Sequence, residues 1–309
     1  MERKVTVPQV YRINDQVLCF YLGRNVTGPS PVADIDGNWV DLDWAWGVCS
    51  YAICDGDEAL IFDTNVYPDQ ALWIRRYLED QRGVRRFTVV LSHWHLDHIS
   101  GNEHFSDCHI IASSRCRQEM IAIKDKAEAG RLWKEPAIKV VLPDIVFEDS
   151  LSVYVGDTEV QLRRYDIHTP DSIAAFVPKY KLCLCGDMLE DTVAFVLTIE
   201  ALVAQRSELE RLKEMGAEVF YPDHGDPEKI SNGGYGPDFI DAVLEYSHNL
   251  VELHDDPDYD KLPIERFIPK ALENGTLSVW PPYVSVHKGN VELVKAYFAN
   301  KTEEEEKGE

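Results

Sequence analysis

Residues 92–102 read SHWHLDHISGN and directly follow an apolar, β-branched segment at residues 87–91. Such a segment is typical of a buried strand, and functional side chains often lie on the loop that follows a strand. The motif places four possible metal ligands within six residues, namely His93, His95, Asp97 and His98. Imidazole nitrogens and carboxylate oxygens are ligands that zinc and similar divalent ions accept. We therefore predict a metal site here, whereas a lone HxH pair would fit ordinary surface histidines.

The same arrangement, an apolar segment that ends close to a histidine or an aspartate, occurs three more times. The residues that follow these segments are His168, Asp187 and His224. A rigid sheet can hold the loops at its strand ends close together. The simplest geometric interpretation is that all four strand ends converge on one site.

The segments around these motifs predict an alternation of strands and helices. We expect strands at residues 59–62, 87–91, 108–112, 160–167, 173–177, 181–185 and 217–221. We expect helices from Pro68, from about residue 113 to Trp133, and from the cap residue Thr198 to Gly216. The predicted fold class is therefore a mixed α/β architecture.

At this point the sequence resembles the metallo-β-lactamase superfamily, whose pattern SHxHxDHxGGN is close to residues 92–102. Further matches are the segments at residues 167–170, 185–187 and 222–225, and together they cover about residues 50 to 230. The resemblance implies a four-layer αββα sandwich with a C-terminal helical extension.

The resemblance also implies a complete set of seven ligands for two metal ions. One ion would be held by His93, His95 and His168, the other by Asp97, His98 and His224, and Asp187 would bridge both. Asp63 resembles a buried aspartate that orients ligand histidines, a role consistent with the second N–H of a metal-bound imidazole. The implied cofactors are two divalent ions per chain, zinc first, with iron or manganese as alternatives.

The resemblance divides the chain into three parts. Residues 1–236 would form the catalytic domain, residues 237–300 a helical extension packed on it, and residues 301–309, KTEEEEKGE, a disordered acidic tail. Within the extension we expect helices at 239–253, 263–272 and 291–298, the last of them capped by Asn290.

Two positions place the chain among its relatives. Asp187 occupies a position where true β-lactamases of this fold generally lack a bridging aspartate, whereas esterases, lactonases, thioesterases and phosphodiesterases keep it. Asp171 and Ser172 stand where many relatives have Gly-His, which makes the resemblance to glyoxalase II-like thioesterases weaker. The resemblance therefore implies a hydrolase of the group that keeps the aspartate.

The implied chemistry is hydrolysis by a hydroxide that bridges two ions about 3.5–4 Å apart. Asp97 is the candidate catalytic residue, because it can hydrogen-bond that hydroxide as well as bind metal. A small ester, lactone or related acyl compound is the favoured substrate. The alternatives are a binuclear phosphodiesterase, an iron-dependent oxygenase resembling persulfide dioxygenases, and a ligand-binding regulator with residual activity.

Three tryptophans in the stretch 28–46, Trp39, Trp44 and Trp46, are candidates for the substrate pocket. Early hairpin loops often overhang the metals in the family, so they could form an apolar flap that recognises a ring or an acyl chain. Core packing or a dimer interface explains the same three residues at least as well.

The 309 residues carry 31 basic and 54 acidic side chains, a formal net charge of −23. This charge argues against nucleic acid and against an anionic membrane surface as partners. No apolar run long enough for a signal peptide or a membrane span is present. Seven cysteines without CxxC spacing favour a reducing compartment. We expect a cytoplasmic protein with a small-molecule substrate, and a homodimer is possible.

Overall fold

The computed structural model describes residues 6–28, 44–133 and 136–308, with side chains to residue 300. Its core is a pair of β-sheets. The first sheet has the order β1 (Gln9–Arg12), β2 (Val17–Leu22), β3 (Val48–Asp55), β4 (Glu58–Phe62), β5 (Arg86–Val90), β6 (His109–Ser113) and β7 (Ile145–Phe147). The second has the order β12 (Val219–Pro222), β11 (Leu182–Gly186), β10 (Ile173–Val177), β9 (Thr158–Arg164) and β8 (Ser150–Val155).

Alternating side chains give the first sheet two apolar faces. In β2, Leu18 and Phe20 belong to one buried cluster, whereas Cys19 and Tyr21 belong to another. This is the period of two that a strand requires when both of its faces are covered. The first cluster lies under two helices, α2 (Pro68–Arg82) and α4 (Ser114–Glu128). The second lies between the two sheets.

The second sheet is covered by helices that come later in the sequence. The cluster between the sheets continues into α5 (Ile199–Lys213) and α7 (Asp238–Glu252). The layers are therefore helix, sheet, sheet and helix, which confirms the predicted αββα sandwich. Short helical segments complete this part of the chain, namely α3 (Leu96–Ile99), η1 (Asn102–Phe105), η2 (Pro178–Tyr180) and α6 (Pro227–Ser231).

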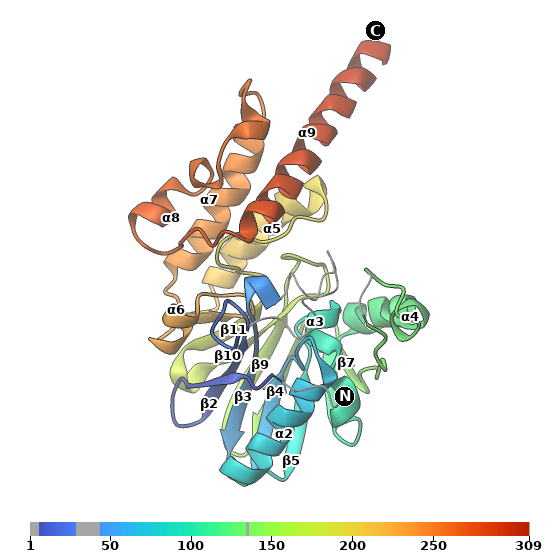
Figure 1. The fold of residues 1–309 in the computed structure, drawn as a ribbon, viewed down its shortest axis with the longest axis vertical. Helices are drawn as coiled ribbons and strands as arrows, with labels where there is room; N and C mark the ends of the chain where they lie inside the picture. Colours follow the sequence, from blue (N-terminus) through green and yellow to red (C-terminus); the bar gives the residue numbers. More distant parts are fainter. Residues whose placement is uncertain (1–5, 29–43, 134–135, 309) are drawn as a thin grey trace.

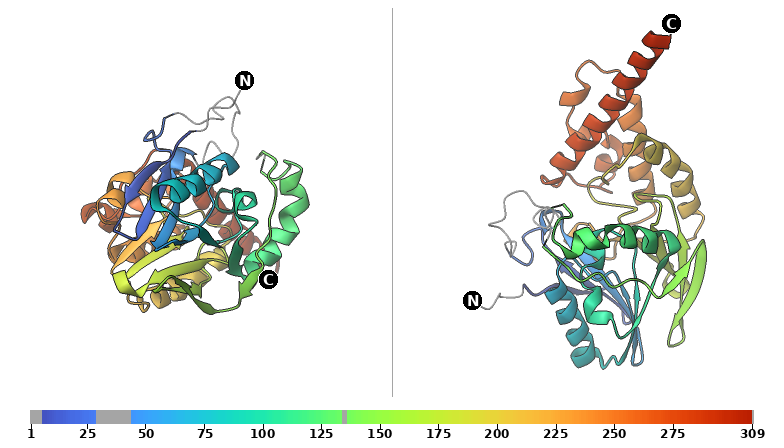
Figure 2. Two further views of the ribbon diagram at one scale, coloured as in Figure 1. Left: turned by 90° about the horizontal axis from the view of Figure 1, so that it is seen from below. Right: turned by 90° about the vertical axis from the view of Figure 1, so that its right-hand side faces the viewer.

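The C-terminal helices stand at one end of the two sheets (Figures 1 and 2). They comprise α7, η3 (Tyr259–Lys261), η4 (Ile264–Arg266), α8 (Pro269–Glu273) and α9 (Tyr283–Gly308), the last of which points away from the sheets. Buried residues of these helices, such as Ile264 and Val294, belong to the same apolar cluster as the residues between the sheets. The boundary proposed at residues 236 and 237 and the disorder proposed for residues 301–309 stay predictions.

Several helix limits differ from those expected. The helix expected to reach Trp133 ends at Glu128, since Gly130 adopts a φ of 61°. The helix capped by Thr198 ends at Lys213. The segment 263–272 is two short helices, η4 and α8, rather than one. Asn290 is no cap, because α9 begins at Tyr283 and Asn290 lies inside it.

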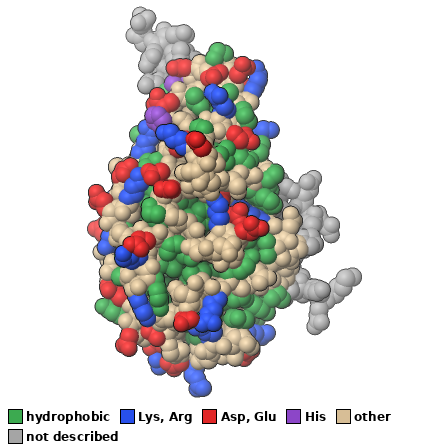
Figure 3. Space-filling model, turned by 90° about the vertical axis from the view of Figure 1, so that its left-hand side faces the viewer, with side chains coloured by type: hydrophobic (Ala, Val, Ile, Leu, Met, Phe, Trp, Pro, Cys, Tyr) green, Lys and Arg blue, Asp and Glu red, His purple; other side chains and the backbone are tan. Residues whose placement is uncertain are grey.

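The surface carries charges of both signs. Figure 3 shows acidic and basic side chains interspersed over one face, without a single large basic patch on that face. Many basic side chains are paired with acids, as in Arg75 with Asp107 at 2.6 Å and Lys295 with Asp260 at 2.7 Å. Within the described part of the chain, no helix is both long enough and apolar enough to cross a membrane.

Candidate metal centre

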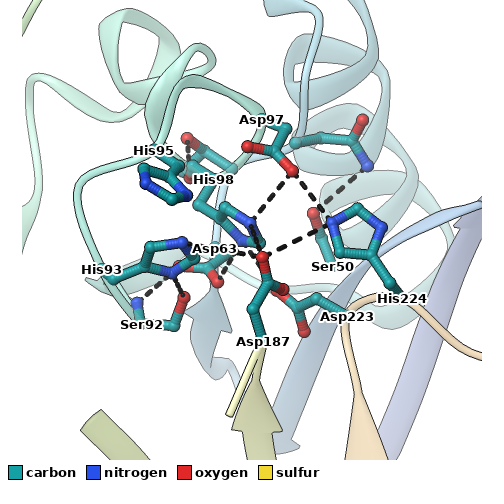
Figure 4. A network of polar contacts seen from close by, with 12 residues as sticks. Ser50, Asp63, Ser92, His93, His95, Asp97, His98, Asp187, Asp223 and His224 are labelled. Atoms are coloured by element: carbon teal, nitrogen blue, oxygen red, sulfur yellow. Dashed lines mark hydrogen bonds and ion pairs between the residues drawn. The ribbon is translucent and has the colours of Figure 1, made fainter. Parts of the chain in front are cut away.

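The seven predicted ligands all come from segments that follow strands. His93 and His95 lie on the loop after β5, and Asp97 and His98 lie in the one-turn helix α3 that follows. The other three come from the second sheet: His168 from the loop between β9 and β10, Asp187 from the residue after β11, and His224 from the loop after β12. Figure 4 shows the Asp187 carboxylate between the imidazoles of His93 and His224.

The first group consists of His93, His95, His168 and Asp187, and one ligand atom from each lies within 4.8 Å of the others. His168 Nε2 is 3.2 Å from His95 Nδ1. Asp187 Oδ2 is 3.6 Å from His93 Nε2 and 3.7 Å from His168 Nε2. Three imidazole nitrogens and a carboxylate oxygen around one point make a typical zinc ligand set.

The second group consists of Asp97, His98, Asp187 and His224, and again one ligand atom from each lies within 4.8 Å of the others. Asp97 Oδ2 is 3.0 Å from Nε2 of both His98 and His224. Asp187 Oδ2 is 3.1 Å from His98 Nε2 and 3.5 Å from His224 Nε2. Asp187 therefore belongs to both groups, which is the position expected of a bridging ligand.

Unpaired polar atoms in this cluster fit a bound cation. Among the residues that the structure describes, His93 Nε2 and Asp187 Oδ1 are buried and have no hydrogen-bond partner. Leaving a polar group buried without a partner costs about 1–3 kcal/mol. Divalent ions between these atoms would satisfy them, so the donor set fits two metal ions in chemistry and in arrangement.

The histidines differ in how strongly they hold protons. Burial lowers the pKa of His93 and His168, and lowers that of His95 to about 3, so these imidazoles are neutral and available as ligands. Burial also opposes protonation of His98 and His224, but the charges of Asp187 and Asp97 outweigh it and raise the pKa of both. A divalent ion must displace those protons, so metal binding is expected to release protons.

The outer nitrogens of the ligand histidines are held by neighbouring oxygens. His98 Nδ1 lies 2.9 Å from Asp63 Oδ2, where the sequence analysis places an orienting aspartate, and 3.1 Å from Asp223 Oδ2. His93 Nδ1 lies 2.9 Å from the hydroxyl of Ser92. Such contacts fix the tautomer and the orientation of a ligand imidazole. Asp223 was missed from the sequence, although it directly precedes His224.

A cavity of about 240 Å³ adjoins the two groups, and five of the ligands line it: His95, Asp97, His168, Asp187 and His224. The other walls are apolar and consist of Trp46, Leu96, Trp133, Phe195, Leu197 and Val286. Glu190 completes the lining, which contains no lysine and no arginine among the described residues.

The three candidate pocket tryptophans have different places. Trp46 lines the cavity. Trp44 instead packs in a small cluster with Leu22, Val48 and neighbouring residues, and its Nε1 donates to Gly28 O at 3.0 Å. Trp39 lies outside the described residues.

Glu190 is a cavity residue that the sequence analysis missed. It is buried, and its Oε2 accepts a hydrogen bond from the Tyr283 hydroxyl at 3.1 Å, while its Oε1 lies 3.9 Å from His168 Nδ1. Burial raises the pKa of Glu190 to about 8. Its position three residues after Asp187 is a signal that could have identified it.

Comparisons with known proteins agree with this architecture. The model of the metallo-beta-lactamase superfamily matches residues 44–224. A metallo-beta-lactamase from Pontibacter korlensis has a similar structure with a TM-score of 0.52 and 15% identity, over 76% of this chain and 99% of that chain. A metallo-beta-lactamase from Hirschia baltica gives a TM-score of 0.51 and 13% identity, over 74% and 95%. At such identities the structures show a shared fold only.

A comparison with curated proteins finds no match to the sequence. The range matched by the family model covers more than half of the 309 residues and includes all seven predicted ligands. The sandwich fold and the two groups of metal ligands agree with the family that this match indicates. The chain belongs to the metallo-beta-lactamase superfamily, a fold that implies the binding of divalent metal ions.

Proposed function

We propose that this chain is a hydrolase that holds two divalent metal ions, zinc in the first place, and cleaves a small ester, lactone or related acyl compound. The observation that carries the proposal is the position of Asp187. One of its oxygens lies 3.1 to 3.7 Å from Nε2 of four histidines, two of which belong to each group. A shared carboxylate between two ligand groups supports a binuclear site rather than a mononuclear one.

The roles of the residues follow from their places. When bound, such ions supply a hydroxide nucleophile at neutral pH and polarise the carbonyl of the substrate. Asp97 borders the cavity and contacts both His98 and His224. We therefore propose that its carboxylate would accept a hydrogen bond from the nucleophile and orient it towards the cavity.

The lining of the cavity supports a neutral acyl substrate. A phosphodiester carries a negative charge, which proteins usually recognise with arginine or lysine. The described lining provides neither. The same lining offers no cation for the anionic thiol compounds that a persulfide oxygenase would bind.

The experiment combines metal analysis with a substrate panel. The chain is purified without chelators, its metals are measured by mass spectrometry, and it is assayed on p-nitrophenyl acetate, γ-butyrolactone and bis-p-nitrophenyl phosphate. We expect two ions per chain and higher kcat/KM on an acyl substrate than on the phosphodiester. A single iron per chain, or a clear preference for the phosphodiester, would overturn the proposal.

We also propose a reducing, cytoplasmic location and small molecules as partners, with a homodimer as a possible assembly. The seven cysteines are free thiols, and all except Cys108 are buried. Burial raises the pKa of most of these thiols, as for Cys183 and Cys185, which makes them unreactive. Free, inert thiols are typical of a compartment where disulfides do not form. Sedimentation of the purified chain would decide between monomer and dimer.

A further inference from the structure

A segment without regular structure forms part of the cavity wall. Residues 192–198, which we name the strap, join the region after β11 to α5 and pair with none of the described strands. Two strap residues, Phe195 and Leu197, line the cavity. Buried backbone groups need hydrogen-bond partners, so the partners of the strap show what holds it in place.

Those partners come from the C-terminal part of the chain. Asn290 of α9 is fully buried, and its Oδ1 accepts from Val196 N at 2.9 Å, while its Nδ2 donates to Ala194 O at 2.9 Å. These two backbone groups flank Phe195 on either side. At the start of the strap, the Thr192 hydroxyl donates to Ser278 O at 2.8 Å and accepts from Trp280 N at 2.9 Å. The C-terminal segment therefore holds the strap at both of these points.

The C-terminal segment also lines the cavity directly. Val286, four residues before Asn290 and thus on the same side of α9, is a wall residue. Asn290 Nδ2 donates in addition to the hydroxyl of Tyr246 in α7 at 3.0 Å, which fixes the amide between the two helices. Three of the apolar wall residues, Phe195, Leu197 and Val286, thus come from α9 itself and from a strap that α9 holds.

The size and chemistry of this wall define what it can bind. A cavity of about 150 Å³ already holds a benzene molecule, and drug-sized ligands need about 300–1,000 Å³. The volume here, about 240 Å³, lies between the two and suits one ring or a short acyl chain next to the reacting group. The wall residues are aromatic or aliphatic, and the lining has no basic residue among those described.

We propose that the strap and α9 form a subsite for an uncharged apolar group of the substrate, an aryl ring or a short acyl chain, and that Asn290 is the residue that positions this subsite. The proposal rests on the proposed function, because the subsite is useful only beside the metal ligands. It assigns substrate selection to the C-terminal helices and bond cleavage to the loops after the strands.

The test measures binding rather than turnover and uses the full, metal-loaded chain. Hydroxamates chelate divalent ions, so acetohydroxamate reports on the metals alone and phenylacetohydroxamate adds a ring that can enter the subsite. We expect calorimetry to give at least tenfold tighter binding of the ring compound, the lower end of the effect of burying an aromatic side chain. A ring compound with a para-carboxylate is expected to lose that advantage.

Two variants test the assigned residues. Asn290→Ala removes two hydrogen bonds of the strap, whereas Val286→Phe fills the subsite and changes no hydrogen-bond partner of the strap. The second variant remains informative if the first fails to fold. Each is expected to reduce the preference for the ring below about threefold and to leave acetohydroxamate binding unchanged. Asn249→Ala is the matched control, because the Asn249 side chain in α7 donates to Phe267 O at 3.0 Å and, among the described residues, forms no hydrogen bond with the strap.

The outcomes separate the subsite from the metal centre. Equal affinity of the wild-type chain for both hydroxamates would overturn the subsite and leave the metal centre standing. A ring preference that survives both variants would overturn the roles of α9 and Asn290. If neither hydroxamate binds to the metal-loaded chain, the proposed metal centre is contradicted, and so is the proposed subsite that depends on it.

Discussion

Replacing Asp171 by asparagine is expected to stabilise the folded chain at neutral pH. Asp171 lies in the loop between β9 and β10 and is 1% exposed. Among the described residues, neither of its carboxylate oxygens has a hydrogen-bond partner in good geometry, and the nearby Thr169 and Cys116 offset its burial only in part. Burial raises the pKa of this carboxyl group from 3.8 to about 6. The ionised form is therefore less favourable in the folded chain than in the unfolded chain.

The size of the effect follows from the two pKa values. As pH rises from about 4 to 6, the unfolded chain loses the Asp171 proton before the folded chain does, so unfolding releases a proton and becomes easier. The difference between 3.8 and about 6 corresponds to about 3 kcal/mol of lost stability at pH 7 and above. At pH 4 only about 0.5 kcal/mol of this loss remains. The asparagine variant carries no such charge and avoids the loss.

The assay is urea unfolding of the metal-free wild type and of Asp171→Asn at pH 4, 5 and 8, with chelator present. Metal must be absent, because a ligand that binds only the folded state raises apparent stability. Asp149→Asn, a change of the same charge at an exposed position, is the control and is expected to have little effect. The reasoning would be refuted if Asp171→Asn gave no increase in the free energy of unfolding at pH 8, or the same increase at all three pH values.

Three further predictions concern the site. Asp187→Asn is expected to reduce the metal content measured by mass spectrometry from two ions per chain towards none, and retention of both would contradict the bridging role. Asp63→Asn is expected to weaken metal binding at His98 by about 10- to 100-fold in a chelator competition, since it removes an orienting carboxylate; unchanged affinity would count against that role. Trp46→Ala is expected to raise KM for an aryl ester, whereas Trp44→Ala should cost about 3–5 kcal/mol of folding stability and leave substrate preference unchanged; the reverse pattern would disprove the distinction.

Part of the fold could be predicted because its segments have clear patterns. The strands β4, β5 and β6 are short apolar runs bounded by turns, and parallel strands of this kind are buried on both faces. The strands β2 and β3 were missed, although they are buried along nearly their whole length. Their sequences, VLCFYL and VCSYAICD, are apolar runs like that of β4, so the same signal could have identified them.

The two halves of the site differ in how visible they are in the sequence. The metal ligands occur in motifs at strand ends, where residue type and spacing are dictated by the ion. The cavity walls show no such motif in the sequence. Trp133, Phe195 and Val286 need only be apolar, and long-range packing brings them together. Asn290 illustrates the limit, since Gly-Asn suggests a helix start, whereas its real partners are backbone groups almost a hundred residues earlier.

The distribution of the proposed ligands along the chain has a consequence for biosynthesis. His224 follows His93 by 131 positions, and a ribosome adding about 5–20 residues per second needs roughly 7 to 26 seconds for that distance. During this interval His93 and His95 have emerged, but Asp187 and His224 are still missing for most of it. An ion captured early is held by an incomplete ligand set that discriminates poorly between metals. The full set of ligands, which could select among divalent ions, therefore exists only once His224 has been translated.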